Sequence, residues 1–142
     1  MNTLKINEKK YIIIFVRLSL GIAFLSAVLD RFGLWGNPGE TNVAWGSFKL
    51  FEDYVFYLNP FLSIVLVKIV AYFVTILEVA LGIMLILGFR LKAVALISAT
   101  LLLIFALSMT FIMGIKVPLD YSVFSVSAAS FLLYLFIKAK EE

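Results

Sequence analysis

Four stretches of this sequence stay apolar for about the length that a helix needs to cross a bilayer, which limits the fold more than any other feature. They cover residues 11–30, 61–87, 91–113 and 121–138. An α-helix rises about 1.5 Å per residue, so about 20 apolar residues span the hydrocarbon layer. We therefore predict an all-α fold, a bundle of four transmembrane helices that forms a single integral membrane domain over residues 1–142.

The composition explains why lipid rather than water is the expected surrounding. Of the residues, 63% are hydrophobic and 15% are charged, whereas soluble domains have about 45–50% apolar and about 25% charged residues. A water-soluble chain this small has too little interior to bury the excess. The lipid bilayer is the predicted partner. Nucleic acid is not expected, because the basic residues are spread along the chain at the ends of apolar runs, where they anchor helices.

The basic residues also predict the orientation, because Lys and Arg favour cytoplasmic loops. The loops assigned to the cytoplasm contain seven basic residues, and those on the other side of the membrane contain three: Arg31, Lys49 and Lys116. Both termini are therefore expected in the cytoplasm, and the first run is expected to be a retained helix because it is longer than a signal-peptide core and no small-x-small cleavage site follows it. The cytoplasmic side is assigned Lys5, Lys9, Lys10, Arg90, Lys92, Lys138 and Lys140.

The outer loop, residues 31–60, is predicted to contain a short amphipathic helix that lies in the membrane interface and covers the outer mouth of the bundle. Thr41 or Asn42 can cap its start. Apolar and charged residues alternate with helical spacing over residues 48–58. A plain aromatic anchor with no ligand role is the alternative. The apolar side consists of Phe48, Phe51, Val55 and Leu58, and the other side carries Lys49, Glu52 and Asp53.

The chain has no cysteine and no histidine. This composition excludes a thiol nucleophile, a disulfide relay, Cys/His zinc sites and His-ligated haem, and it removes the commonest general base. No metal site and no catalytic constellation are predicted, so an enzyme is the less favoured interpretation. The sequence requires no cofactor. If the protein binds one, a quinone would suit the apolar spans.

Glu78 lies within the second span, where a carboxylate facing lipid costs about 2.5–3.5 kcal/mol. At 100° per residue, a single stripe contains Lys68, Thr75 and Glu78 together with the small residues Ala71 and Gly82. Small residues allow a second helix to approach closely. The stripe is therefore expected to face the bundle interior.

Arg17, in the first span, is the predicted partner of Glu78, because its planar fork can hold a carboxylate through two hydrogen bonds. The pair has two interpretations, a buried ion pair that fixes the helix register or a site that handles a proton or ligand. The predicted buried polar site comprises Glu78, Arg17, Thr75 and Lys68.

A second polar cluster is expected at the outer surface, where the first span ends and the last one begins. Asp120 can also be explained as a helix cap that complements the helix dipole. The cluster consists of Asp30, Arg31, Lys116, Asp120 and Tyr121.

Three segments resemble the DoxX family of small bacterial membrane proteins. They are RLSLGIAFL from Arg17, EVALG from Glu78 and LGFR from Leu87. The resemblance covers nearly the whole chain and implies a four-helix bundle in the bacterial cytoplasmic (inner) membrane. The family is named after a relative of a thiosulfate:quinone oxidoreductase subunit, and some members are linked to membrane thiol-stress complexes. Without cysteine, this chain has no thiol chemistry of its own.

The favoured function is a non-catalytic membrane component that binds a hydrophobic small molecule, a quinone or a lipid, or a membrane redox partner. A small proton-coupled transporter is an alternative, since a lone membrane carboxylate is the usual proton relay, although no inverted repeat or broken helix is evident. A quinone-linked oxidoreductase subunit and an assembly factor for other membrane proteins are further alternatives. A homo-oligomer is compatible with each of them.

Overall fold

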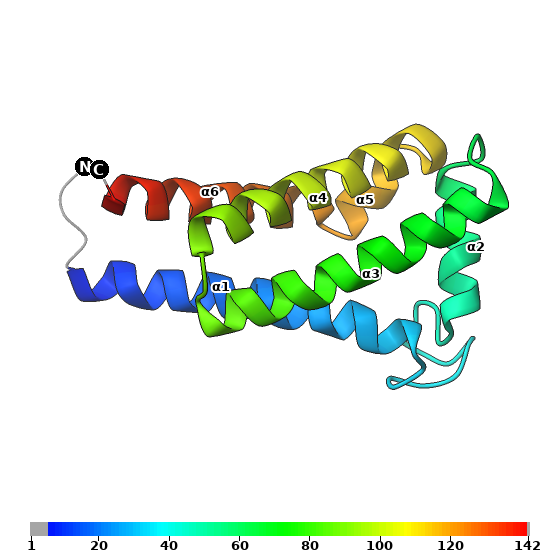
Figure 1. Ribbon diagram of the computed structural model, residues 1–142, viewed down its shortest axis with the longest axis horizontal. Coiled ribbons are helices and arrows are strands. Elements are labelled where there is room, and N and C mark those ends of the chain that lie inside the picture. The colour runs from blue at the N-terminus through cyan, green and yellow to red at the C-terminus, as the bar shows by residue number, and fades with distance from the viewer. Residues whose placement is uncertain (1–5, 142) are drawn as a thin grey trace.

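The computed structural model describes residues 6–141, which are helical through most of their length and contain no strand. Four of the helices are long and apolar enough to cross a membrane, which confirms the predicted all-α bundle of four spans and makes the chain a multi-pass membrane protein. The elements in chain order are α1 (Ile6–Arg31), α2 (Phe48–Leu58), α3 (Ile64–Leu87), α4 (Leu91–Met113), α5 (Lys116–Asp120) and α6 (Val123–Glu141) (Figure 1).

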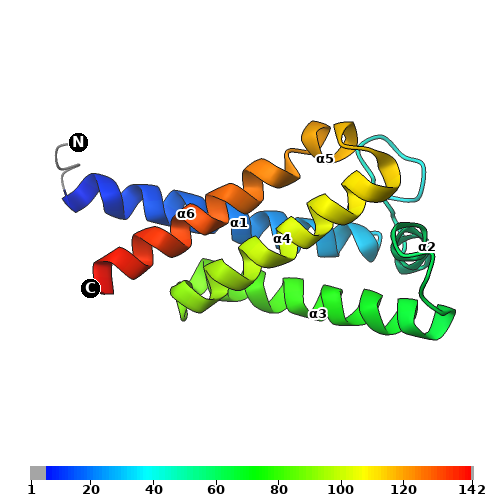
Figure 2. The same ribbon diagram turned by 90° about the horizontal axis from the view of Figure 1, so that it is seen from above.

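The four long helices form two tightly packed pairs. α1 lies along α3 and α4 lies along α6, with sparser contacts between the pairs; Figures 1 and 2 show this arrangement from two sides. The beginning of α1, the end of α6 and the α3–α4 hairpin lie at one end of the bundle, here called the terminal end. The opposite end, which carries α2 and α5, is called the loop end.

Two helix boundaries differ from the predicted spans because local capping sets them. α3 begins at Ile64 rather than directly after Pro60, since Ser63 is its N-cap and its hydroxyl accepts the Leu66 N–H at 3.3 Å. The last span begins at Val123 rather than at residue 121. The turn before it forms the one-turn helix α5.

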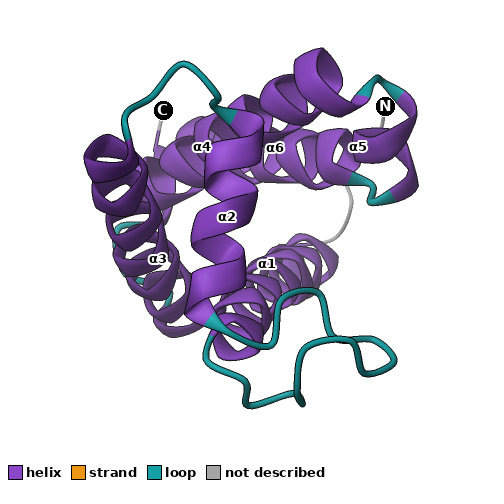
Figure 3. Ribbon diagram, turned by 90° about the vertical axis from the view of Figure 1, so that its right-hand side faces the viewer, coloured by secondary structure: helices purple, strands orange, loops and turns teal. Residues whose placement is uncertain are grey.

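The short helix predicted in the outer loop is present as α2, and Figure 3 shows it lying across the loop end, over the ends of the long helices. The predicted cap at Thr41 or Asn42 is wrong. The chain makes further turns after Asn42, which itself has φ 66°, and the cap is Ser47, whose hydroxyl accepts the Leu50 N–H at 3.4 Å.

The buried side of α2 includes three of the apolar residues predicted for it, Phe51, Val55 and Leu58. Glu52, predicted on the other face, is also buried, with 9% of its surface exposed. The buried arc is wide because α2 contacts α1, α3 and α4 rather than a single neighbour.

The interior is small and most large apolar side chains point outward, as expected where lipid replaces water. One core cluster lies between the long helices, and a second lies where α2 packs on α3. Outward residues such as Phe61 and Phe111 are more than three-quarters exposed. The second cluster consists of Phe51, Val55, Val67, Ala71 and Val74.

α1 and α3 approach most closely where two glycines face each other. A Cβ on Gly21 would lie 2.8 Å from the carbonyl oxygen of Gly82 and 2.8 Å from the Ile86 side chain. Real Cβ atoms do not come this close to a backbone oxygen. This contact fixes the register of α1 against α3, and therefore decides which polar side chains meet across the interface.

Candidate functional site at the loop end of the bundle

The stripe predicted on α3 faces the bundle interior along most of its length. Ala71, Thr75 and Glu78 are at most 5% exposed, and Gly82 is buried. Lys68 is an exception and is exposed. α1 ends opposite Thr75, so no part of α1 lies beside Lys68 and its ammonium group can reach the surface.

Glu78 forms its ion pair with Arg31, the last residue of α1, and not with Arg17 as predicted. The same guanidinium donates from Nη1 to Thr75 Oγ1 at 3.0 Å, and the Thr75 hydroxyl donates to the Ala71 carbonyl at 2.8 Å. Arg31 and Glu78 are only 2% and 3% exposed.

Arg17 has a different partner because of the register in which the antiparallel helices α1 and α3 pack. The beginning of α1 therefore lies beside the end of α3, and Arg17 Nη2 donates to the Ile86 carbonyl at 2.9 Å. Glu78 lies nine residues before Leu87, about 14 Å further along the helix at 1.5 Å per residue. The Arg17 guanidinium instead lies against Gly88, where a Cβ would be 2.5 Å from its Nη1.

Aromatic rings cover the Arg31 guanidinium on the side of the loop end. Its Cζ lies 3.7 Å from the centroid of the Phe51 ring on α2 and 5.3 Å from that of Trp45. Arginine is attracted to the faces of such rings. α2 and the preceding loop therefore close the Arg31–Glu78 pair off from the loop end.

Asp30 precedes Arg31 and ties the outer loop to α1. Its Oδ2 accepts the backbone N–H groups of Ala44 and Trp45, both at 3.0 Å, and its side chain is 5% exposed. Among residues 6–141, no group donates a hydrogen bond to its other oxygen, Oδ1. A buried carboxylate is thus left with one unused acceptor.

Asp30 also lines a surface groove of about 680 Å³, here called the outer groove, between α1 and the outer loop. Trp35 forms part of its rim, held by a hydrogen bond from its indole N–H to the Ser26 carbonyl at 3.0 Å. One wall is made by Ala23, Ser26 and Ala27 of α1, and the other by Trp35, Thr41, Asn42, Ala44 and Trp45.

The cluster predicted at the outer surface is not assembled as one group. Asp30 and Arg31 are buried, whereas Lys116 and Asp120 form an exposed i,i+4 ion pair on α5, and Tyr121 is 73% exposed. A single helical turn places residues four apart on one face, and this face of α5 points away from the protein. Asp120 ends α5 and does not cap α6.

Sequence reasoning missed the roles of Arg31 and Asp30 in this site. A signal for Arg31 was available, because residues 17, 21, 24, 28 and 31 share one face of α1, and that face packs against α3. The hydrogen bonds from the loop backbone to Asp30 have no comparable signal. They depend on how residues 32–47 fold back, and this segment has no periodic pattern.

No protein-family model, no curated protein and no solved structure matches this chain. We therefore infer its function from the chemistry of the residues at the loop end.

Proposed function

We propose that this chain is a DoxX-like, non-catalytic membrane component that binds an amphiphilic molecule of the bilayer, a quinol or a lipid, in the outer groove. The observation that carries the proposal is Asp30, a buried carboxylate with an unused acceptor that lines an open groove. The two-pair bundle, with Gly21 against Gly82 and Arg17 against Gly88, provides a structural reason for the segments that resemble the DoxX family.

The charge of the buried groups favours a ligand whose head group donates hydrogen bonds. Asp30, Glu52 and Glu78 each contribute one negative charge and Arg31 one positive charge, so the four ionised groups have a formal charge of −2. An unsatisfied buried acceptor costs about 1–3 kcal/mol, which a donor from the ligand would recover once the atoms that cover Oδ1 move aside. A quinol hydroxyl or the ammonium group of an aminophospholipid is such a donor, whereas an oxidised quinone ring offers only acceptors.

The walls of the groove suit the apolar part of such a molecule. Ala23 and Ala27 have small side chains, so a hydrocarbon chain can lie along this part of α1. The Trp35 and Trp45 rings fit the membrane interface, where amphipathic aromatic residues are favoured. The Arg31–Glu78 pair is closed off by α2, so we assign it the role of holding α1 and α3 in place beside the groove rather than of touching the ligand.

Ligand retention with Asp30→Asn tests the proposal. The asparagine oxygen can still accept the Ala44 and Trp45 N–H groups, while its amide nitrogen replaces the unused acceptor and removes the charge. Since hydrogen bonds to charged groups contribute about 1.5–3 kcal/mol, we expect affinity to fall by about 10–100-fold. Binding of a quinol, the matching quinone and a phosphatidylethanolamine to purified protein is compared by titration, which separates the two ligand classes.

Two further variants control this test. Ala27→Leu fills part of the groove while the Asp30 carboxylate is retained, and it should also weaken binding. Asp53→Asn removes an exposed carboxylate of α2 at the same end and should leave binding unchanged. Equal binding by the wild type, Asp30→Asn and Ala27→Leu would reject the outer groove as a ligand site.

We further propose that the protein lies in a bacterial cytoplasmic membrane with its terminal end in the cytoplasm. The terminal end carries the α3–α4 hairpin with Arg90 and Lys92 and the last turns of α6 with Lys138 and Lys140, consistent with the preference of basic residues for cytoplasmic loops. An exposed pair, Lys116 and Asp120, lies at the opposite end.

Because the chain has no cysteine, single-cysteine labelling can test this orientation without background. We expect Lys116→Cys to react with a membrane-impermeant maleimide in spheroplasts, and Lys140→Cys to react only after the membrane is broken. The reverse pattern would show that the orientation is inverted.

A further inference from the structure

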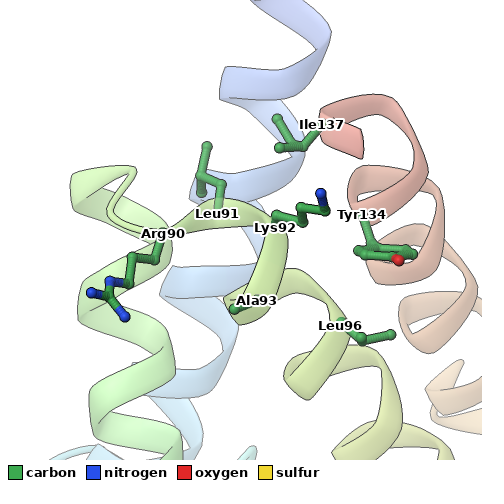
Figure 4. A pocket seen from close by; sticks show the side chains of 7 residues that line it. All are labelled: Arg90, Leu91, Lys92, Ala93, Leu96, Tyr134 and Ile137. Carbon is green, nitrogen blue, oxygen red and sulfur yellow. The ribbon is translucent and has the colours of Figure 1, made fainter. Parts of the chain in front are cut away.

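A second groove, of about 690 Å³, lies at the terminal end, where α4 begins beside the last turns of α6. It is separate from the outer groove, which lies at the opposite end of α1. Arg90, Lys92 and Tyr134 contribute its polar groups, while Leu96 and Ile137 contribute apolar walls. Figure 4 shows Lys92 and Tyr134 on one side of the α4 start, and Arg90 projecting on the other side of Leu91.

The surroundings of this groove are strongly basic. Within residues 8–140, the terminal end carries one acidic residue, Glu8, against seven basic ones. The start of α4 adds the positive end of a helix dipole to the field of these side chains. The basic residues are Lys9, Lys10, Arg17, Arg90, Lys92, Lys138 and Lys140.

We infer that this groove binds an anionic phospholipid of the bilayer, with the phosphate at Lys92 and the Tyr134 hydroxyl, Arg90 at the rim, and an acyl chain along Leu96 and Ile137. The inference does not depend on a ligand in the outer groove. Basic pockets between transmembrane helices at a membrane surface match anionic head groups, and charge complementarity therefore selects this occupant.

The apolar walls distinguish a lipid from a soluble anion. A free phosphate would contact only the basic groups and not the apolar wall at Leu96, which is 38% exposed. A phospholipid uses both parts of the groove, because its phosphate lies in the interface and its chains run beside the helices. We therefore expect binding to require the acyl chain as well as the charge.

The test is a titration of the purified full-length protein with phosphatidylglycerol and with phosphatidylcholine of the same acyl chains, read out as bound lipid by native mass spectrometry. The wild type should bind phosphatidylglycerol more tightly. In the double variant Arg90→Gln/Lys92→Gln this preference should fall by about 10–30-fold, because each basic residue near the surface contributes about 1 kcal/mol to the attraction of an anionic lipid. Binding of phosphatidylcholine should change much less, because its choline group neutralises the charge of its phosphate.

The control is Lys49→Gln/Lys116→Gln, which removes the same charge from the exposed loop end. It should retain the preference for phosphatidylglycerol. Tyr134→Phe, which removes a single hydroxyl and should not affect folding, is expected to weaken the binding of phosphatidylglycerol by about threefold, in keeping with the net contribution of one hydrogen bond.

Three results would overturn the inference. They are equal affinity of the wild type for the two lipids, an equal loss in the loop-end control, and full competition by inorganic phosphate at millimolar concentration. The last result would indicate a soluble anion instead of a lipid. None of them affects the outer groove, where Asp30→Asn is measured separately.

Discussion

Arg31→Met is expected to lower the free energy of unfolding by about 3–5 kcal/mol, because removing one partner of a buried ion pair leaves the other charge without compensation. Arg31 and Glu78 are 2% and 3% exposed, so water cannot solvate the remaining carboxylate. The Phe51 ring also loses the guanidinium on its face. Unfolding by a denaturing detergent in mixed micelles measures the change.

Two comparisons separate the loss of the pair from the loss of any charge. In Arg31→Met/Glu78→Leu no charge is left unpaired, and we expect most of the stability to return, since apolar replacements of buried pairs are often neutral. Lys116→Met breaks the exposed pair on α5 and should change stability by less than about 1 kcal/mol. An Arg31→Met protein as stable as Lys116→Met would show that the buried pair contributes little.

Gly21→Val is expected to lower the free energy of unfolding by about 1–3 kcal/mol, because extra carbons in a close contact overpack it. The first added carbon would lie 2.8 Å from the Gly82 carbonyl oxygen, and backbone on the facing helix cannot move aside as a flexible side chain can. α1 and α3 must separate, which also pulls Arg31 away from Thr75 and Glu78. The same unfolding assay should therefore show the loss together with weaker ligand binding in the outer groove.

Ser19→Val is the matched control for Gly21→Val. Ser19 is exposed on the same helix, two residues away and on the lipid-facing side, so the added carbons meet lipid rather than backbone. Its stability should remain within about 0.5 kcal/mol of the wild type, as is usual for surface substitutions. If both variants lose stability equally, the cause is β-branching in α1 and not the close approach of the helices.

The four spans could be predicted from the sequence because lipid imposes one simple requirement, a long apolar helix, on each of them. The interior position of Glu78 followed from the stripe with Ala71 and Thr75, which combines the helical period with the cost of charge in lipid. Both arguments use spacing within a single helix. They hold regardless of how the helices are placed relative to one another.

The partner of Glu78 could not be predicted in the same way, because it depends on the register between two helices. Arg17 was the predicted partner because its planar fork can hold a carboxylate, but that property does not determine the register between two helices. The contact between Gly21 and Gly82 instead aligns α1 so that Arg31 meets Thr75. The N-cap at Ser47 and the hydrogen bonds to Asp30 depend likewise on the path of a loop that has no repeating pattern.

The hydrogen bonds from residues 44 and 45 to Asp30 affect how a ligand can enter and leave the outer groove. They hold the segment before α2 against the end of α1, so residues 44 and 45 cannot leave α1 unless both bonds break. On the side formed by Ala23, Ser26 and Ala27, the loop is joined to α1 by a side-chain hydrogen bond, from the Trp35 indole to the Ser26 carbonyl. We therefore expect a ligand of the outer groove to enter and leave past Trp35, whose side-chain hydrogen bond breaks more easily than the two bonds to Asp30, and to exchange directly with the surrounding leaflet.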